Sequence, residues 1–158
     1  MGISDLRDGL PAENLHVTVC FVGAIEEERV SAVRAVAAGV RGMRATLHFD
    51  AFDYWDSSKI LCATARENGD APVAGFAARL GEALIAAGFT PDIKPFRAHL
   101  TLGRKVRAEL AAGIEWPLAL PENFVLRADR FALMDSRRND GGSVYSVVDS
   151  WPLYGAEA

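Results

Sequence analysis

Two of the three histidines in this 158-residue sequence are followed two residues later by a threonine, as His16 with Thr18 and as His99 with Thr101. An imidazole can accept or donate a proton near neutral pH, because its ordinary pKa is about 6.5. A threonine hydroxyl can donate a hydrogen bond to an anionic oxygen. Two such pairs suit a phosphate group, with one imidazole acting as base, the other as acid, and both hydroxyls binding the non-bridging oxygens.

The residues around each pair indicate a β-strand. Apolar side chains alternate with the polar ones in Leu15-His16-Val17-Thr18-Val19 and again in Ala98-His99-Leu100-Thr101-Leu102. Because side chains alternate between the faces of a strand, each histidine shares a face with its threonine, and the apolar side chains face the core. With five threonines in the chain, this repeat has a chance probability of about 0.003. The repeat therefore points to a shared site.

Other interpretations of the histidines are less favoured. A single motif of this kind would indicate a structural histidine in the core or at its rim, but the repeat argues against that. His16 and His99 could supply two nitrogens to zinc, yet no neighbouring pattern supplies the third protein ligand of a hydrolytic site. His48 lies between two apolar residues and is expected on the solvent face of a strand. We therefore expect neither a metal nor a cofactor.

Composition indicates one globular domain over residues 1–158. The chain is 50% hydrophobic and 24% charged, which excludes collagen-like, coiled-coil and disordered classes. No apolar run approaches the roughly 20 residues of a membrane span, and the polar start lacks the apolar region of a signal peptide. We expect a cytoplasmic protein. Cys20 and Cys62 lie in apolar runs and are expected to be small buried hydrophobes.

The formal net charge of −4 argues against a long nucleic acid as partner. One window, between Asp92 and Glu109, contains no acid and is basic. Its cations are Lys94, Arg97, Arg104, Lys105 and Arg107. By itself this basic window would indicate an ordinary solvent-exposed surface. Because the window surrounds His99, it favours an anionic ligand instead.

Periodicity and turn residues predict a mixed α+β fold with short connections. The expected helices cover residues 26–40 and 72–87, and the expected strands cover 15–22, 44–52, 59–65, 96–103, 124–133 and 143–148. Gly141 and Gly142 are expected to turn the chain between the last two strands.

Four segments resemble the 2H phosphoesterases, and within that group the LigT-like RNA 2′,3′-cyclic phosphodiesterases, also called 2′-5′ RNA ligases. Residues 11–23 resemble the first His-x-Thr motif of that family, and residues 96–104 resemble the second. Gly142-Ser143-Val144-Tyr145 and Trp151-Pro152-Leu153 are similar to its C-terminal part. The resemblance extends from about Leu10 to Leu153.

The resemblance implies a bilobal α+β fold, with two pseudo-symmetric lobes of antiparallel sheet and helices around a central cleft. It also implies metal-independent hydrolysis of 2′,3′-cyclic phosphate ends to 2′-phosphates, with reversible 2′-5′ joining in some members. If the family's roles apply to the matching residues, His16 and His99 would be the catalytic acid and base. The resemblance does not say which of the two is the acid. Thr18 and Thr101 would bind the phosphate.

The same resemblance suggests contacts to the nucleotide. Phe21 would stack on a base and Arg104 would offer its guanidinium, as single-strand binding commonly requires. Core packing is the alternative for Phe21. Tyr145 is a further candidate, and weaker candidates are Arg97, Lys105 and Arg138. The expected partners are RNA ends or nucleoside 2′,3′-cyclic phosphates, with no membrane.

Family members usually place a strand and a helix before the first motif, whereas only 15 residues precede His16 here. We expect that unit to be missing and the protein to be a monomer, with dimerisation through an exposed sheet edge as the alternative. Two other functions stay open. They are a 2H enzyme for 2′-5′ linked oligonucleotides or small cyclic nucleotides, and a non-catalytic module that binds RNA ends or phosphate.

Overall fold

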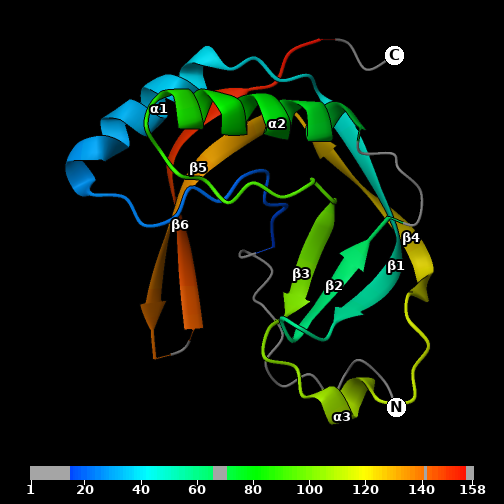
Figure 1. Ribbon diagram of the computed structural model, residues 1–158. Helices are drawn as coiled ribbons and strands as arrows, with labels where there is room; N and C mark the ends of the chain where they lie inside the picture. The colour runs from blue at the N-terminus through cyan, green and yellow to red at the C-terminus, as the bar shows by residue number, and fades with distance from the viewer. Residues whose placement is uncertain (1–14, 66–70, 141, 156–158) are drawn as a thin grey trace. The chain divides into compact units, whose positions relative to one another are not determined.

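The computed structural model describes residues 15–65, 71–140 and 142–155 (Figure 1). The described elements are a 3-10 turn η3 (Glu27–Arg29), α1 (Val30–Gly39), β1 (Ala45–Trp55), β2 (Ile60–Thr64), α2 (Ala71–Ala86), β3 (His99–Gly103), α3 (Ala108–Ala111), β4 (Leu118–Ala128), β5 (Arg130–Asn139) and β6 (Gly142–Pro152). The predicted α+β class is confirmed. The chain divides into two compact units, and the single domain over 1–158 stays a prediction.

Among the described residues, the first unit contains 15–17, 47–65 and 98–126. Its main feature is a four-stranded sheet in the order β3-β2-β1-β4, and β1, β2 and β3 lie side by side in Figure 1. The β1–β2 and β2–β3 pairs are antiparallel. Alternate residues of β1 are buried, and Phe49 stacks on Phe124 of β4 with ring centroids 4.9 Å apart. His48, which precedes Phe49 on β1, is exposed as predicted.

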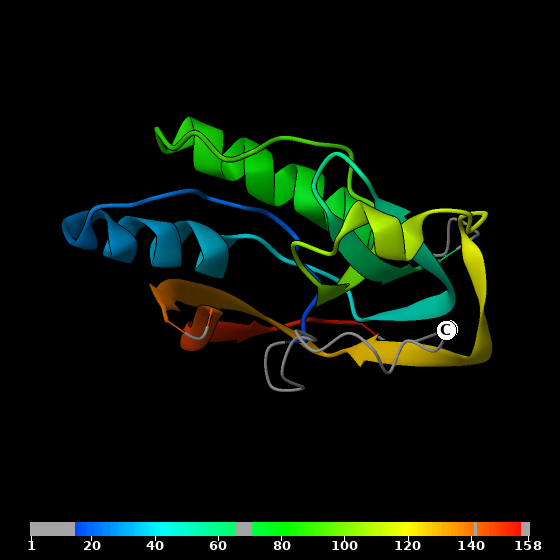
Figure 2. The ribbon, with the colours of Figure 1, turned by 90° about the horizontal axis from the view of Figure 1, so that it is seen from below.

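Among the described residues, the second unit contains 18–46, 71–97, 127–140 and 142–155, with α1, α2 and the antiparallel pair β5–β6. The two helices run side by side (Figure 2). Phe76 of α2 packs edge-on against Phe131 of β5, with centroids 4.8 Å apart, and Val33 and Leu84 are buried in the same cluster. This unit therefore has its own apolar core between the helices and the hairpin.

A glycine lies at or just after the end of each long helix. Gly88 follows α2 with φ of 80°, a conformation that glycine adopts without steric cost. α1 ends at Gly39, and Gly42 lies where the chain enters β1. A Cβ built on Gly42 would lie 2.5 Å from Leu153 Cδ2 and 2.9 Å from Phe76 Cδ2. Only a residue without a side chain fits this crossing of elements.

Two strand predictions are wrong. The strand expected over 124–133 is divided at Asp129 between β4, which neighbours β1, and β5, which pairs with β6. The Asp129 carbonyl accepts a hydrogen bond from Leu153 N at 2.8 Å, and this marks the change of partner. The strand expected over 15–22 is irregular, with a single bridge between Phe21 and Asp92. Alternation alone is not sufficient, because a strand also needs a ladder of backbone partners.

Candidate active site

The second His-x-Thr motif lies on β3, where the sequence predicts it. His99 pairs with Thr64 of β2, and Thr101 pairs with Cys62. His99 is half-buried, whereas Thr101 is only 7% exposed. β3 thus fixes the backbone of both polar residues within a sheet.

The register brings further polar groups to the same face of the sheet. Cys62, opposite Thr101, also pairs with Asp53 of β1. Since directly paired residues share a face, Asp53 and Thr64 lie on the face that carries His99 and Thr101. Thr64 is 1% exposed, and among the described residues every buried side-chain nitrogen or oxygen has a hydrogen-bond partner. The polar groups of this face are therefore satisfied where they are buried.

Trp55, the last residue of β1, contacts His99 directly. The two ring centroids lie 4.7 Å apart with an interplanar angle of 55°. The indole Nε1–H donates a hydrogen bond to Asp53 Oδ2 at 3.1 Å. The sequence alone did not single out Asp53 or Trp55, because the predicted strand ends at residue 52 and the register of β1 against β3 is not visible in the sequence. The aspartate-aromatic pair at a strand end was the one available signal.

The first motif has a different local structure. His16 is half-buried and belongs to the first unit, whereas Thr18 is exposed and belongs to the second. Val19, Cys20 and Val22 pack against the core cluster of the second unit. Convergence of the His16 and Thr18 pair with the His99 and Thr101 pair stays a prediction.

The nucleotide-binding candidates differ in exposure. Phe21 is 64% exposed, so the core-packing alternative is wrong. Its backbone is fixed by a hydrogen bond from Asp92 N to Phe21 O at 2.9 Å. Arg104 is exposed, and Tyr145 is half-buried on β6 opposite Ser136. The weaker candidates Arg97, Lys105 and Arg138 are all exposed.

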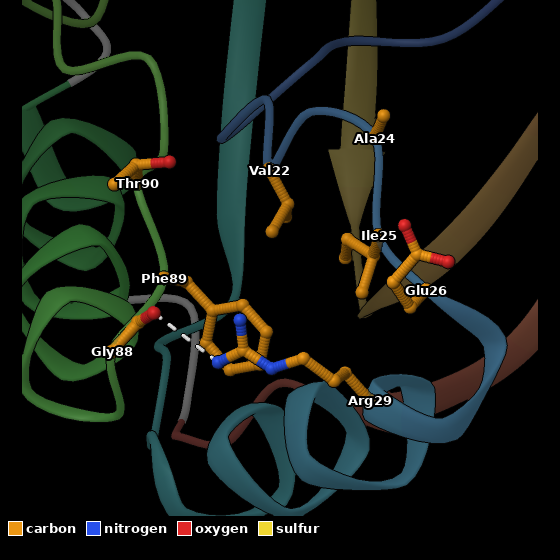
Figure 3. A pocket seen from close by; sticks show the side chains of 8 residues that line it. All are labelled: Val22, Ala24, Ile25, Glu26, Arg29, Gly88, Phe89 and Thr90. Carbon is orange, nitrogen blue, oxygen red and sulfur yellow. Dashed lines mark hydrogen bonds between the residues drawn. The ribbon is translucent and has the colours of Figure 1, made fainter.

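A hollow in the second unit is lined by none of the four motif residues. Its lining residues are Val22, Ala24, Ile25, Glu26, Arg29, Gly88, Phe89 and Thr90 (Figure 3). Arg29 donates a hydrogen bond to the Gly88 carbonyl at 3.2 Å, and its guanidinium lies 4.1 Å from the centre of the Phe89 ring. Arg29 thus connects η3 to the end of α2. These contacts account for the position of its side chain, and no bound ligand is needed to explain it.

The two cysteines differ in burial, because Cys20 is half-buried and Cys62 is buried. Burial raises the pKa of the Cys20 thiol, and the negative charge of Asp92 adds to the increase. The thiol is therefore protonated at neutral pH and is a poor nucleophile. Cys62 is fully buried, as predicted. Neither cysteine forms a disulfide.

The statements on metal sites and membrane spans that follow apply to the described residues only. In those parts of the chain no three or more His, Cys, Asp or Glu residues gather as a metal site would require. None of the helices described is long and apolar enough to span a bilayer.

Comparisons with known proteins agree with the sequence resemblance. Residues 3–140 match the family model described as the 2′-5′ RNA ligase superfamily. The RNA 2′,3′-cyclic phosphodiesterase of Escherichia coli (strain K12) is 28% identical over 148 residues, which are 90% of this chain and 77% of that protein.

Solved structures share the fold. A crystal structure of a phosphoesterase matches with a TM-score of 0.79 at 24% identity, over 94% of this chain and 82% of that chain. E. coli LigT complexed with 3′-AMP matches with a TM-score of 0.78 at 24% identity, over 93% and 81%. The protein TT0787 of Thermus thermophilus gives 0.67 at 24% identity, over 98% and 87%. The fold is thus LigT-like.

Proposed function

Since this chain belongs to the 2′-5′ RNA ligase superfamily, we propose that it hydrolyses 2′,3′-cyclic phosphate ends of RNA or of nucleosides to 2′-phosphates. The observation that carries the proposal is the repeated His-x-Thr motif in a chain of this family. The name of the E. coli relative supports the same substrate class.

The proposed reaction needs one base and one acid. Water attacks phosphorus, and one of His16 and His99 accepts the proton that the water loses. The bond from phosphorus to the 3′ oxygen breaks, and the other imidazole donates a proton to that oxygen. The product carries a 3′ hydroxyl and a 2′-phosphate. The base gains one proton and the acid loses one, so the protonation states of the two imidazoles are exchanged after the step, and proton exchange with water restores them before the next turnover.

The hydroxyls of Thr18 and Thr101 are proposed to donate hydrogen bonds to the non-bridging oxygens. The low exposure of Thr101, 7%, supports this role, because a hydrogen bond to an anion is stronger away from bulk water. Its position two residues from His99 on the same strand face supports contact of both side chains with one phosphate.

Binding of the nucleotide is proposed to involve Phe21, Arg104 and Tyr145. The exposed ring of Phe21 offers a stacking surface to a base. The exposed Arg104 follows β3 directly and offers positive charge close in sequence to His99 and Thr101. We expect neither metal nor cofactor to be needed.

Single substitutions of the two histidines test the proposal. We expect His16→Ala and His99→Ala each to lower kcat on a nucleoside 2′,3′-cyclic phosphate by about 10² to 10⁴-fold, the usual contribution of an acid or base. Activity of the unaltered protein is expected to persist in EDTA. His48→Ala is the matched control, because His48 is exposed on β1, and it should keep full activity. Normal turnover by the double variant His16→Ala/His99→Ala would refute the mechanism.

The family description favours a second activity, the joining of RNA ends through a 2′-5′ bond. This reaction would use the same histidines, with an RNA 5′ hydroxyl replacing water as the attacking group. We expect His99→Ala to abolish joining and hydrolysis together. Loss of only one activity would assign the two reactions to different sites. Binding of a 2′-phosphonucleotide without turnover of any cyclic phosphate would instead identify a binding module.

A further inference from the structure

We propose that Trp55 positions the imidazole of His99, an inference that rests on the proposed function. The rings lie 4.7 Å apart at an interplanar angle of 55°. This distance and tilt fall in the range of favourable aromatic contacts. The indole therefore restricts the rotation of the imidazole about its side-chain bonds.

Trp55 is itself held at both ends. Its carbonyl accepts hydrogen bonds from Ser58 N at 3.2 Å and from Ser58 Oγ at 3.3 Å, in the turn that follows β1. Its indole N–H donates to Asp53 Oδ2 at 3.1 Å. Since Asp53 lies two residues earlier on the same strand face, this bond fixes the direction of the indole over the sheet.

The backbone of His99 is fixed as well. β3 pairs with β2 through Thr64 opposite His99, and the neighbours Ala98 and Leu100 are 2% and 7% exposed. The imidazole moves relative to this backbone by rotation about its two side-chain bonds, and the contact with Trp55 is one restraint on that rotation. The indole itself takes no part in proton transfer.

Proton transfer depends strongly on alignment, and a displacement of 1 Å can cost about 100-fold in rate. We expect Trp55→Ala to lower kcat on a nucleoside 2′,3′-cyclic phosphate by about 10 to 100-fold, with KM changed by less than about threefold. Trp55→Phe keeps an aromatic ring and should recover kcat to within about threefold of the unaltered protein. If Trp55→Ala fails to fold, Trp55→Leu replaces it with the same expectation.

A spectroscopic measurement tests the contact without activity. The ring current of the indole shifts the resonances of the His99 ring protons, which can be assigned by their absence in His99→Ala. Trp55→Ala should move these resonances. Trp116→Ala is the matched control, because Trp116 belongs to the same unit but contacts Tyr54 and donates to the Ala111 carbonyl. It should leave both the His99 resonances and kcat unchanged.

The outcomes separate this inference from the proposed function. If the unaltered protein is active and His99→Ala is not, normal kcat in Trp55→Ala overturns the positioning role. If the unaltered protein shows no hydrolysis, the proposed function fails, and the resonances alone decide the contact. Whether or not the unaltered protein is active, His99 resonances that do not change in Trp55→Ala overturn the proposed contact and with it the positioning role. A fall in kcat with rescue by Trp55→Phe supports it.

Discussion

At the scale of single residues, charge pairs outside the proposed site give the most direct tests of the second unit. Arg34 of α1 and Asp149 of β6 form an ion pair with Nη2 and Oδ2 2.7 Å apart. The Arg34 Nε–H also donates to Asp149 Oδ2 at 2.8 Å. The backbone Ser150 N–H donates to the other oxygen, Oδ1, at 2.8 Å. This carboxylate therefore connects helix α1 to the hairpin.

The Arg34 hydrogen bond, followed by that of Ser150, lowers the pKa of Asp149 below its ordinary value of 3.8. A lowered pKa in the folded state stabilises the fold above the unfolded pKa, and this stabilisation disappears as the pH falls through the folded pKa. We expect Asp149→Asn to lower the urea midpoint of unfolding slightly at pH 6 and to have a smaller effect at pH 2.5. Both partners are partly exposed, so the change is small.

Arg34→Gln is the companion variant for this measurement. It removes the same ion pair from the other side, so the two substitutions combined should cost less than their sum. An Asp149→Asn effect of equal size at both pH values would contradict the assignment of the stabilisation to the charged carboxylate.

The sequence could predict the motif residues but not their surroundings. The types and spacing of His99 and Thr101 suffice to place them on one face of a strand. The contact of His99 with Trp55 depends on the β1–β2–β3 register, which includes an irregularity between Leu61 and Cys62. No local pattern in the sequence encodes that register.

At the scale of elements, the helices were the most predictable parts of the chain. The helices predicted over 26–40 and 72–87 agree with η3 and α1 together and with α2 to within a few residues. Ile85 is apolar and follows the buried Leu84 on α2, but it is 52% exposed. The face that a helix buries is set by its neighbours, and here the neighbours are α1 and β5.

The close approach at Gly42 predicts a specific sensitivity to volume. Gly42→Ala would place a methyl group against Leu153 and Phe76, and overpacking of this kind costs about 1 to 3 kcal/mol. We expect the free energy of unfolding to fall by that amount in urea titrations. Gly39→Ala is the control, because nothing lies within 4 Å of a Cβ there. Equal effects of both substitutions would contradict the packing explanation.

For the chain taken together, the central test is whether the two units unfold in one transition. The prediction of one domain implies one cooperative transition. The tryptophans allow a test, because Trp55 and Trp116 belong to the first unit and Trp151 to the second. In a Trp151→Phe background, fluorescence reports the first unit alone.

Leu84→Ala in that background perturbs only the core of the second unit, where Leu84 is 1% exposed. Loss of a buried leucine side chain costs about 2 to 5 kcal/mol. If the chain is one cooperative domain, the fluorescence midpoint of the first unit should fall with it. Ile85→Ala, on the exposed side of α2, should change little. An unchanged midpoint in Leu84→Ala would show that the units unfold separately.

The change of partner at Asp129 also has a consequence for protein engineering. β4 ends at Ala128 and β5 begins at Arg130, so Asp129 alone connects the two strands. There is no loop between them in which an added residue could be placed. An insertion here would shift β5 by one position and turn Phe131 and Leu133 away from the helices. Tags, fusion points and new chain termini should therefore be kept away from Asp129.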